Sequence, residues 1–257
     1  MKNHPARINR RTFIGTTGAF TAGITLLPGP FIARFAGDAR WWEKEPLRIV
    51  ELEEGFEFAE KAQLLKDLGA NMEHLVRFAD NSPGTSFLDE HNLYGGKKVY
   101  FSSLKEYLLE AHKNGIKVVI YYNVHAILSS YAHQHRDWQQ IQDDGKPIET
   151  VYSVDSSFCI NSPWRTEVFQ TLKKLVSYEI DGVFYDGPIF FANTCHCESC
   201  KNLFRTKYSG EIPSKTELSS RRDDLGWKEL LEFQSDSIAT FLRDSNKILK
   251  EANPEIL

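Results

Sequence analysis

The chain has 257 residues, a length that suits one large domain or two small ones. Aromatic residues make up 12% of it, which favours a packed α/β domain and excludes disorder of the whole chain. The formal net charge is −4, and neither a stripe of Lys and Arg nor a glycine-rich phosphate loop is present, which argues against nucleic acid as a partner.

The N-terminal segment has the pattern of a targeting signal. Residues 9–14 read NRRTFI, and a weakly apolar run follows over residues 15–27. Paired arginines before such a run resemble a twin-arginine export signal, so residues 1–39 are predicted to be a signal and the mature protein to be periplasmic or secreted. The alternative is a basic start before a membrane anchor. The apolar run is short, contains glycine and ends at Pro28, so it is too poor to span a membrane, and we expect no span later in the chain.

After the signal, hydrophobic periodicity predicts alternating strands and helices. Strands are expected over residues 47–52, 72–79, 116–122 and 182–185. Helices are expected over residues 58–68, 103–113, 164–175 and 223–250, with a further helix starting at Leu203 and Phe204. The first helix is expected to carry Phe58, Ala62, Leu65 and Leu68 on its apolar face, and the third to carry Trp164, Val168, Leu172 and Leu175. Gly69 and Gly115 are natural helix ends, and Ser162-Pro163 has the order favoured at a helix start.

This order of elements predicts parallel strands joined by right-handed helical crossovers over residues 40–257. Long polar loops follow the strands and short loops follow the helices, which is typical of a (β/α)8 barrel of the TIM type. Only about four βα units are present, whereas such a barrel closes with eight. We therefore expect the N-terminal part of a longer barrel, or a half-barrel completed by another chain, with self-association through the open edge as one route.

The first candidate for chemistry is Asp186. It follows a short apolar run, Val183-Phe184-Tyr185, and precedes Gly187-Pro188, which no regular element continues through. A charged group at the carboxyl end of a parallel strand is where barrel enzymes place their reactive side chains. The structural alternative is that Asp186 caps the next helix or accepts a backbone hydrogen bond.

Polar and aromatic residues near the ends of the other strands are candidate sugar contacts. Asn123 and His125 share a parity along the third strand and are expected to face the barrel mouth, with Tyr122 beside them. Asp80 closes the second strand. Trp138 either stacks on a sugar ring or anchors the long loop that follows the third strand.

Four cysteines form the second candidate centre. Cys195, Cys197 and Cys200 lie close together in sequence, and Cys159 lies in the loop after the third strand. Loops after neighbouring parallel strands lie side by side, so the four sulfur atoms can converge on a structural zinc ion, with His196 able to replace one cysteine. Two disulfides are the main alternative in an oxidising compartment, and a redox role is a weaker one.

Several of these motifs together resemble the hypothetical glycosyl hydrolase 6 family, which is akin to α-L-fucosidases and barrel β-galactosidases. The resemblance extends over about residues 47–213. It is carried by KEYLLEAHKNGIKVVIYY at 105–122, Asp137-Trp138, DGKP at 144–147, FCINSP at 158–163 and IDGVFYDG at 180–187.

The resemblance implies a glycosidase that acts on a carbohydrate and needs no cofactor for catalysis. Asp186 matches the position of the nucleophile in fucosidase-like barrels, and retaining hydrolysis needs a second, protonated carboxyl about 5 Å away. That acid usually comes from a later strand in such barrels. Asp80, Asp89 and Glu90 are candidates within this chain, although each is expected to be a solvated loop charge.

The cysteine spacing also resembles the zinc cluster of some barrel β-galactosidases, in which a Phe-Arg pair follows, as Phe204-Arg205 does here. A protein of a different class, a non-catalytic carbohydrate-binding barrel that keeps the fold and lacks the acid, stays open as the alternative function. The sequence specifies neither the sugar nor its anomeric configuration.

Overall fold

The computed structural model describes residues 40–52, 56–75, 101–148, 155–191, 195–220 and 225–257. The chain divides into two units, residues 1–39 and 40–257, and the described residues belong to the second. The predicted export signal, residues 76–79 of the expected second strand, and the candidate carboxyls Asp80, Asp89 and Glu90 lie outside the described residues. Within the described part, no helix has both the length and the apolar character needed to cross a membrane.

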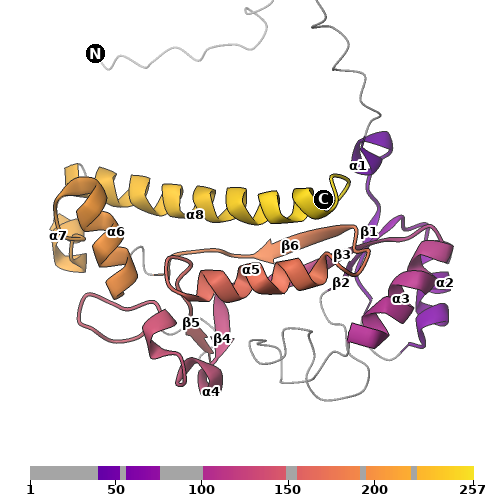
Figure 1. Cartoon of the computed structure of the whole chain (residues 1–257), viewed down its shortest axis with the longest axis horizontal. Coiled ribbons are helices and arrows are strands. Elements are labelled where there is room, and N and C mark those ends of the chain that lie inside the picture. The colour runs from indigo at the N-terminus through magenta and orange to yellow at the C-terminus, as the bar shows by residue number, and fades with distance from the viewer. Residues whose placement is uncertain (1–39, 53–55, 76–100, 149–154, 192–194, 221–224) are drawn as a thin grey trace, which may run out of the picture. The chain divides into compact units, whose positions relative to one another are not determined.

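The second unit alternates strands and helices in the predicted order (Figure 1). The strands are β1 Ile49–Val50, β2 Met72–Leu75, β3 Lys117–Asn123, β4 Ala126–Leu128, β5 Asp155–Ser157 and β6 Gly182–Asp186. The helices are α1 Trp41–Lys44, α2 Phe58–Asp67, α3 Phe101–Lys113, α4 Ser129–Ala132, the 3-10 turn η2 Arg136–Trp138, α5 Trp164–Leu175, α6 Glu198–Tyr208, α7 Lys215–Ser220 and α8 Leu225–Ala252.

Four of the strands form one parallel sheet in the order β1-β2-β3-β6, which confirms the predicted parallel pairing. Helix α2 follows β1 and α3 follows β2, whereas α5 follows β3 only after α4 and η2, and α8 follows β6 only after α6 and α7. The long segment between β3 and α5 contains a second, two-stranded antiparallel sheet of β4 and β5, which the sequence did not predict. The protein is thus a mixed α/β structure built on a parallel sheet.

One face of the parallel sheet is covered by helices. Val118, Ile120 and Tyr122 of β3 are fully buried there in one core with apolar residues of the helices. Helix α5 contributes Trp164, Val168, Leu172 and Leu175, the four residues predicted for its apolar face. Helix α8 lies beside α5 (Figure 1) and adds Phe241 and Leu249 to the same core.

The opposite face of the sheet is partly open. It carries Ile49, Tyr121 and Phe184, and 53% of Ile49 and 51% of Phe184 is exposed. Because successive side chains of a strand point to opposite faces, the same face also carries Asn123 and Asp186 at the carboxyl ends of β3 and β6. We call this the open face.

Local sequence signals explain where the helices begin and end. Gly69 and Gly115 follow α2 and α3 with φ angles of 77° and 76°, a left-handed conformation that glycine adopts without steric cost. The Ser162 hydroxyl accepts a hydrogen bond from the Trp164 amide at 3.3 Å, which satisfies one of the first amides of α5. All three helix boundaries agree with the prediction to within a residue or two.

Two predictions of local structure are wrong. Helix α6 begins at Glu198, several residues before Leu203, because Cys197 already occupies the N-cap position and its carbonyl accepts from the Lys201 amide at 3.0 Å. Leu68 was expected on the apolar face of the first helix. It is 58% exposed because α2 ends at Asp67.

The edge of β6 also pairs with the last residue of the chain. The Leu257 amide donates to the Asp181 carbonyl at 2.8 Å, and the Leu257 carbonyl accepts from the Val183 amide at 3.1 Å. These two bonds flank one residue of β6, which is the pattern of parallel strands. Leu257 therefore lies where the next strand of a parallel sheet would run.

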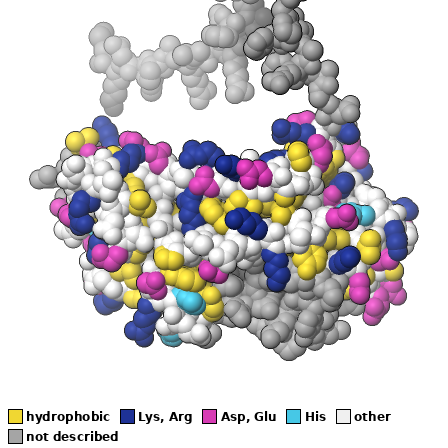
Figure 2. Space-filling model, viewed as in Figure 1, with side chains coloured by type: hydrophobic (Ala, Val, Ile, Leu, Met, Phe, Trp, Pro, Cys, Tyr) yellow, Lys and Arg dark blue, Asp and Glu magenta, His cyan; other side chains and the backbone are white. Residues whose placement is uncertain are grey.

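The surface of α8 carries charges of both signs. Figure 2 shows Lys and Arg side chains interspersed with Asp and Glu along this helix. Arg165 of α5 pairs with Asp244 at 2.6 Å, and Lys207 of α6 pairs with Glu232 at 2.9 Å, so α8 is tied to two other helices. Such exposed pairs contribute little each, about 0–1 kcal/mol.

A nearly buried carboxylate fixes the amino-terminal end of β6. Asp181 accepts from the His112 Nε2 atom at 2.7 Å, from the Lys117 Nζ atom at 2.8 Å and from the Val118 amide at 2.9 Å. Burial alone would raise the pKa of Asp181, but these hydrogen bonds outweigh it and lower the pKa below its usual value. The ionised form is therefore the one that the fold stabilises.

We predict that Asp181→Asn lowers the free energy of unfolding at pH 7 by about 1–3 kcal/mol, because a charged hydrogen-bond acceptor is lost. We expect a loss of unfolding free energy at the lower end of this range, since 40% of the Lys117 side chain is exposed and its charge is screened by solvent. Because the pKa is depressed in the folded state, this stabilisation is present above the unfolded value of about 3.9 and disappears as pH falls below it. Urea unfolding between pH 3 and pH 7 measures both effects.

The exposed Asp67, which accepts from Gln63 at 2.8 Å, provides the matched control. Asp67→Asn should leave the stability and its pH dependence close to those of the wild type. An Asp181→Asn variant with wild-type stability at pH 7 would contradict the role given to this carboxylate.

Candidate functional site

Asp186 ends β6, as predicted, and it lies on the open face. It pairs in register with Asn123, the last residue of β3, so the two side chains emerge together at the carboxyl edge of the sheet. The Tyr121 hydroxyl donates a hydrogen bond to the Asp186 Oδ2 atom. About a third of the Asp186 side chain is exposed, so the carboxylate is both held by the protein and open to a ligand.

His125 lies against the backbone of Asp186. Its Nδ1 atom is 2.8 Å from the Asp186 carbonyl oxygen and 3.8 Å from the Oδ1 atom. A carbonyl oxygen only accepts, so Nδ1 carries the proton. The His125 amide also donates to the Asn123 Oδ1 atom at 3.1 Å, and the ring packs against Phe191 with centroids 5.4 Å apart.

Asn123 and His125 therefore lie next to Asp186, as their shared parity predicted. Both are buried, with only 4% and 5% of their surface exposed. The His125 ring holds the Asp186 carbonyl, and the Asn123 Oδ1 atom holds the His125 amide, so the pair supports the backbone at Asp186.

Two further side chains of the open face were missed by the sequence analysis. His74 of β2 packs its ring edge against Phe184 and Tyr121, with centroids 4.6 and 5.7 Å apart. Glu51, directly after β1, lies 3.7 Å from the His74 Nδ1 atom, and 56% of its side chain is exposed. Burial lowers the pKa of His74, while the charge of Glu51 acts to raise it. Alternation along β1 and β2, taken together with the register of the parallel sheet, assigns both residues to the face of Asp186.

Tyr122 does not belong to this site, which corrects the sequence-based assignment. It points to the helix-covered face, is fully buried, and its ring packs against Tyr185 with centroids 6.2 Å apart. Burial raises the pKa of its hydroxyl well above the usual range. Its neighbour Tyr121 has the opposite parity and reaches Asp186 instead.

Trp138 lies in an aromatic cluster. Its ring stacks on His135 with centroids 3.9 Å apart and contacts Phe158 and Trp164 at 5.7 and 6.1 Å. These contacts favour the second of its two predicted roles, the anchoring of the loop after β3.

A buried glutamine joins the loops that surround Asp186. The Gln140 Nε2 atom donates to the carbonyls of Phe158 and Ile189 at 3.1 and 2.8 Å, and its Oε1 atom accepts from the Phe191 amide at 3.0 Å. One side chain thus holds the segment before β5, the segment after it and the loop after β6 in one arrangement. Phe191, which packs on His125, is positioned by the same bonds.

The four cysteines converge, as predicted. The sulfur atoms of Cys159, Cys195, Cys197 and Cys200 lie within 4.8 Å of one another, and all four residues are buried. The Cys159 and Cys200 sulfur atoms are 3.4 Å apart, so no disulfide joins them, and the other two thiols are also free. We call these residues the tetracysteine cluster.

The geometry of the tetracysteine cluster fits a tetrahedral metal ion. Zn–S bonds of about 2.3 Å place the sulfur atoms of a tetrahedral site roughly 3.8 Å apart. Sulfur–sulfur distances between 3.4 and 4.8 Å include this value. Four thiolates leave no open coordination position, so such a site would be structural.

Crowding and burial act in opposite directions on the pKa values of the cluster. Hydrogen bonds from Cys159, Cys195 and Cys200 lower the pKa of Cys197, whereas burial raises the pKa of Cys159. His196 lies between two of the cysteines in sequence, and its amide donates to the Ile141 carbonyl at 2.7 Å. Four sulfur atoms converge without its ring, so His196 is not needed as a ligand.

The parallel sheet, its helical cover and the polar groups at its carboxyl edge define an α/β protein of the TIM-barrel type. Similar folds occur in β-galactosidases from the psychrophilic Marinomonas ef1 (14% identity, TM-score 0.59), from the Antarctic haloarchaeon Halorubrum lacusprofundi (16%, 0.57) and from Bacillus circulans sp. alkalophilus (15%, 0.55). The matches cover 81%, 81% and 82% of this chain but only 35% of each of those chains. At this identity the likeness concerns the fold alone.

Residues 58–187, just over half of the chain, match the family model described as hypothetical glycosyl hydrolase 6. The chain therefore belongs to the hypothetical glycosyl hydrolase 6 family. A comparison with curated proteins found no match.

We predict that Gly187→Ala destabilises the protein, because the new methyl group collides with the His125 ring next to Asp186. Gly187 has a φ of 89°, and a Cβ atom added there would lie 2.8 Å from the His125 Nδ1 atom. A side chain in this conformation costs about 1–3 kcal/mol, and the histidine ring must move as well. The variant should therefore unfold at a lower urea concentration than the wild type.

Gly210→Ala is the control, since Gly210 has no positive φ and an added Cβ atom would lie 3.9 Å from its nearest contact, the Tyr208 carbonyl. Equal stability of Gly187→Ala and wild type would show that His125 is not held against this turn.

Proposed function

We propose that this protein is a glycoside hydrolase that cleaves a carbohydrate with retention of configuration, and that Asp186 is its nucleophile. The observation that carries the proposal is the position of Asp186, a partly exposed carboxylate at the carboxyl edge of a parallel sheet and hydrogen-bonded to Tyr121. Membership in a glycosyl hydrolase family supports a carbohydrate as the substrate class.

In this mechanism the Asp186 carboxylate attacks the anomeric carbon while the glycosidic C–O bond breaks and the general acid protonates the departing oxygen, which leaves a covalent glycosyl-enzyme intermediate. Water then attacks the same carbon, releases the sugar and the Asp186 carboxylate, and returns a proton to the acid. The Tyr121 hydroxyl donates a hydrogen bond to the Asp186 Oδ2 atom and so fixes the orientation of the carboxylate before attack. Asn123 and His125 support the same geometry from the buried side.

The open face offers groups that could bind a sugar next to Asp186. Phe184 presents an exposed aromatic surface for an apolar sugar face, and Glu51 and His74 present polar groups for hydroxyls. Glu51 is also a carboxylate of the described residues on the same face as Asp186. We assign it to substrate binding and expect the general acid to come from a later strand of the barrel.

The four parallel strands are, in this proposal, the first four of an eight-stranded barrel. The pairing of Leu257 beside β6 supports this, as does the likeness to proteins of which this chain covers about a third. Further strands of the same polypeptide or a second copy of this chain would complete the barrel. Sedimentation of the 257-residue chain distinguishes these cases, because completion by a second copy requires a dimer.

The tetracysteine cluster is proposed to hold a structural zinc ion, with Cys159, Cys195, Cys197 and Cys200 as its ligands. Zinc would supply a rigid cross-link between the segment before α5 and the start of α6, and no catalytic step. Export in the folded state through the predicted twin-arginine signal would allow zinc to bind in the cytoplasm, before the protein reaches the periplasm or the medium.

We predict one zinc ion per chain in protein purified without chelators, measured by elemental analysis. Cys200→Ser should abolish stoichiometric zinc and lower the thermal midpoint, because the cross-link of two loops is lost. A wild-type protein without zinc, whose four cysteines form two disulfides by mass spectrometry, would contradict this part of the proposal.

We predict that a panel of dinitrophenyl glycosides contains a substrate of the wild-type protein, because this leaving group departs without protonation. Asp186→Asn should show no measurable turnover, since an amide cannot act as the nucleophile. Tyr121→Phe should lower kcat about 10- to 100-fold, as expected when a hydrogen bond to a charged group of about 1.5–3 kcal/mol is lost.

Asp67→Asn, far in sequence from the site and exposed on α2, should keep full activity. Hydrolysis that survives in Asp186→Asn would refute the nucleophile assignment. Tight binding of a sugar without hydrolysis of any glycoside would favour the non-catalytic carbohydrate-binding alternative.

A further inference from the structure

Asn161 is the polar residue that lies directly against two sulfur atoms of the tetracysteine cluster. Its backbone amide donates to the Cys159 Sγ atom at 3.4 Å, and its side-chain Nδ2 atom donates to the Cys200 Sγ atom at 3.4 Å. One residue thus supplies a donor to each of the two cysteines whose sulfur atoms are 3.4 Å apart.

The second proton of the Asn161 amide is also used. Nδ2 donates to the Ser237 Oγ atom at 2.9 Å, and the Ser237 hydroxyl in turn donates to the Phe233 carbonyl at 2.8 Å. Ser237 is buried within α8, so this serine accepts from Asn161 and satisfies its own proton inside the helix. The amide is therefore fixed in one orientation, with its other N–H directed at Cys200.

Helix α8 contributes to two separate cores. Leu230 and Phe233 pack with the cysteines, whereas Phe241 and Leu249 pack in the core beneath the parallel sheet. Ser237 lies between these two groups along the helix. The bond from Asn161 to Ser237 therefore joins the cluster to the part of α8 between its two buried groups.

The two N–H donors of Asn161 are better partners for thiolates than for neutral thiols. An N–H group is a weak partner for a neutral thiol and a much stronger one for a thiolate, because hydrogen bonds to ionised acceptors are charge-assisted. Thiolates are the form in which cysteines bind a metal ion. The two N–H groups of Asn161 are therefore arranged for a metal-loaded cluster.

We infer that Asn161 is a positioning residue of the metal centre, and that its bond to Ser237 couples metal occupancy to the docking of α8. This inference rests on the proposed zinc ion and goes beyond it, since it names the residue that tunes the thiolates and the element that responds to metal. It assigns no catalytic role to Asn161.

The test is a competition between the protein and a chromophoric chelator for Zn²⁺. Asn161→Ala should bind zinc about 10- to 100-fold more weakly than the wild type, which is the usual cost of removing such an outer hydrogen bond. Asn161→Asp should lose more, because a carboxylate provides no donor and repels the thiolates. Ser237→Ala should lose less, because Asn161 keeps its donors and loses only its anchor.

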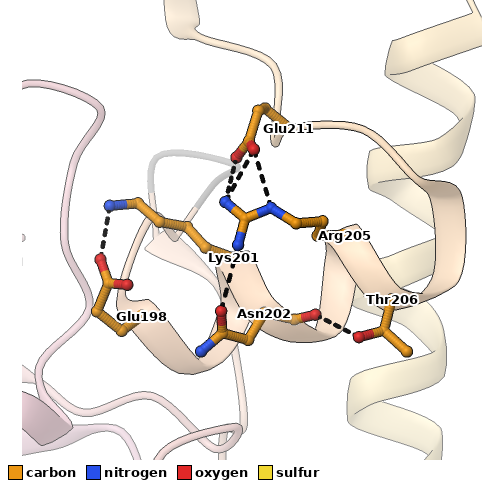
Figure 3. A network of polar contacts seen from close by, with 6 residues as sticks. All are labelled: Glu198, Lys201, Asn202, Arg205, Thr206 and Glu211. Carbon is orange, nitrogen blue, oxygen red and sulfur yellow. Dashed lines mark hydrogen bonds and ion pairs between the residues drawn. The ribbon is translucent and has the colours of Figure 1, made fainter.

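Asn202 provides the matched control. It lies on the exposed side of α6, where its Oδ1 atom accepts from Arg205 at 3.4 Å within a surface network (Figure 3). Asn202→Ala should bind zinc as tightly as the wild type.

A spectroscopic readout separates tuning of the sulfur atoms from general loosening of the fold. In the Co²⁺-loaded protein, loss of the hydrogen bond to Cys200 should shift the sulfur-to-cobalt charge-transfer band to lower energy in Asn161→Ala. Hydrogen exchange of the α8 amides around Ser237 should slow on zinc binding in the wild type, and this difference should shrink in Asn161→Ala and in Ser237→Ala.

The measurements separate the role of Asn161 from the presence of the zinc ion itself. Zinc in the wild type, with the same affinity and the same cobalt spectrum in Asn161→Ala, overturns the inference and leaves the zinc centre intact. A wild-type protein that binds no zinc overturns the metal centre and this inference with it.

Discussion

The register between β3 and β6 is the constraint on which the rest of the structure depends. It pairs Asn123 with Asp186 and Tyr121 with Phe184. The Tyr121 hydroxyl therefore lies on the same face as the Asp186 carboxylate, two residues further along β6, and reaches it. A shift of one residue would turn Asp186 toward the helices and bring its charge into the core, at a large cost in free energy. Burial of the helix-covered face therefore fixes the face on which the carboxylate emerges. The site is a consequence of how the sheet is packed.

The loops above this edge are held in two ways. Gln140 joins its own segment to two others by hydrogen bonds to backbone groups, one at Phe158 after β5 and two in the loop after β6, at Ile189 and Phe191. The tetracysteine cluster holds the far end of the same loop, since Cys195 and Cys197 lie just before α6 and Cys159 lies just after β5. Long loops lose much conformational entropy when they are ordered, so the zinc cross-link proposed at this point would favour a single arrangement around Asp186.

Much of this organisation could be predicted from the sequence because the signals are local. Apolar runs defined the parallel strands, the spacing of Trp164 and Val168 defined the buried side of α5, and the convergence of the cysteines followed from adjacent loops. The choice between Tyr121 and Tyr122 could not be made in this way, because both lie in one apolar run and only the helical cover tells the two faces apart. Glu51 was missed because alternation within one strand does not give the register between strands, and that register places Glu51 on the face of Asp186. The bonds of Asn161 to Ser237 join residues far apart in sequence, and no local pattern marks them.

The central claim is that Asp186 attacks the anomeric carbon of a sugar. It is tested most directly by incubating the protein with dinitrophenyl 2-deoxy-2-fluoro glycosides, measuring its intact mass and mapping any adduct by peptide digestion. The fluorine slows breakdown of the glycosyl-enzyme intermediate, so a retaining enzyme accumulates it. The account predicts a mass increase of one fluoroglycosyl unit, located on the peptide that contains Asp186 and missing in Asp186→Ala. An adduct on another carboxylate, or no adduct from any sugar on protein shown to be folded, would contradict it.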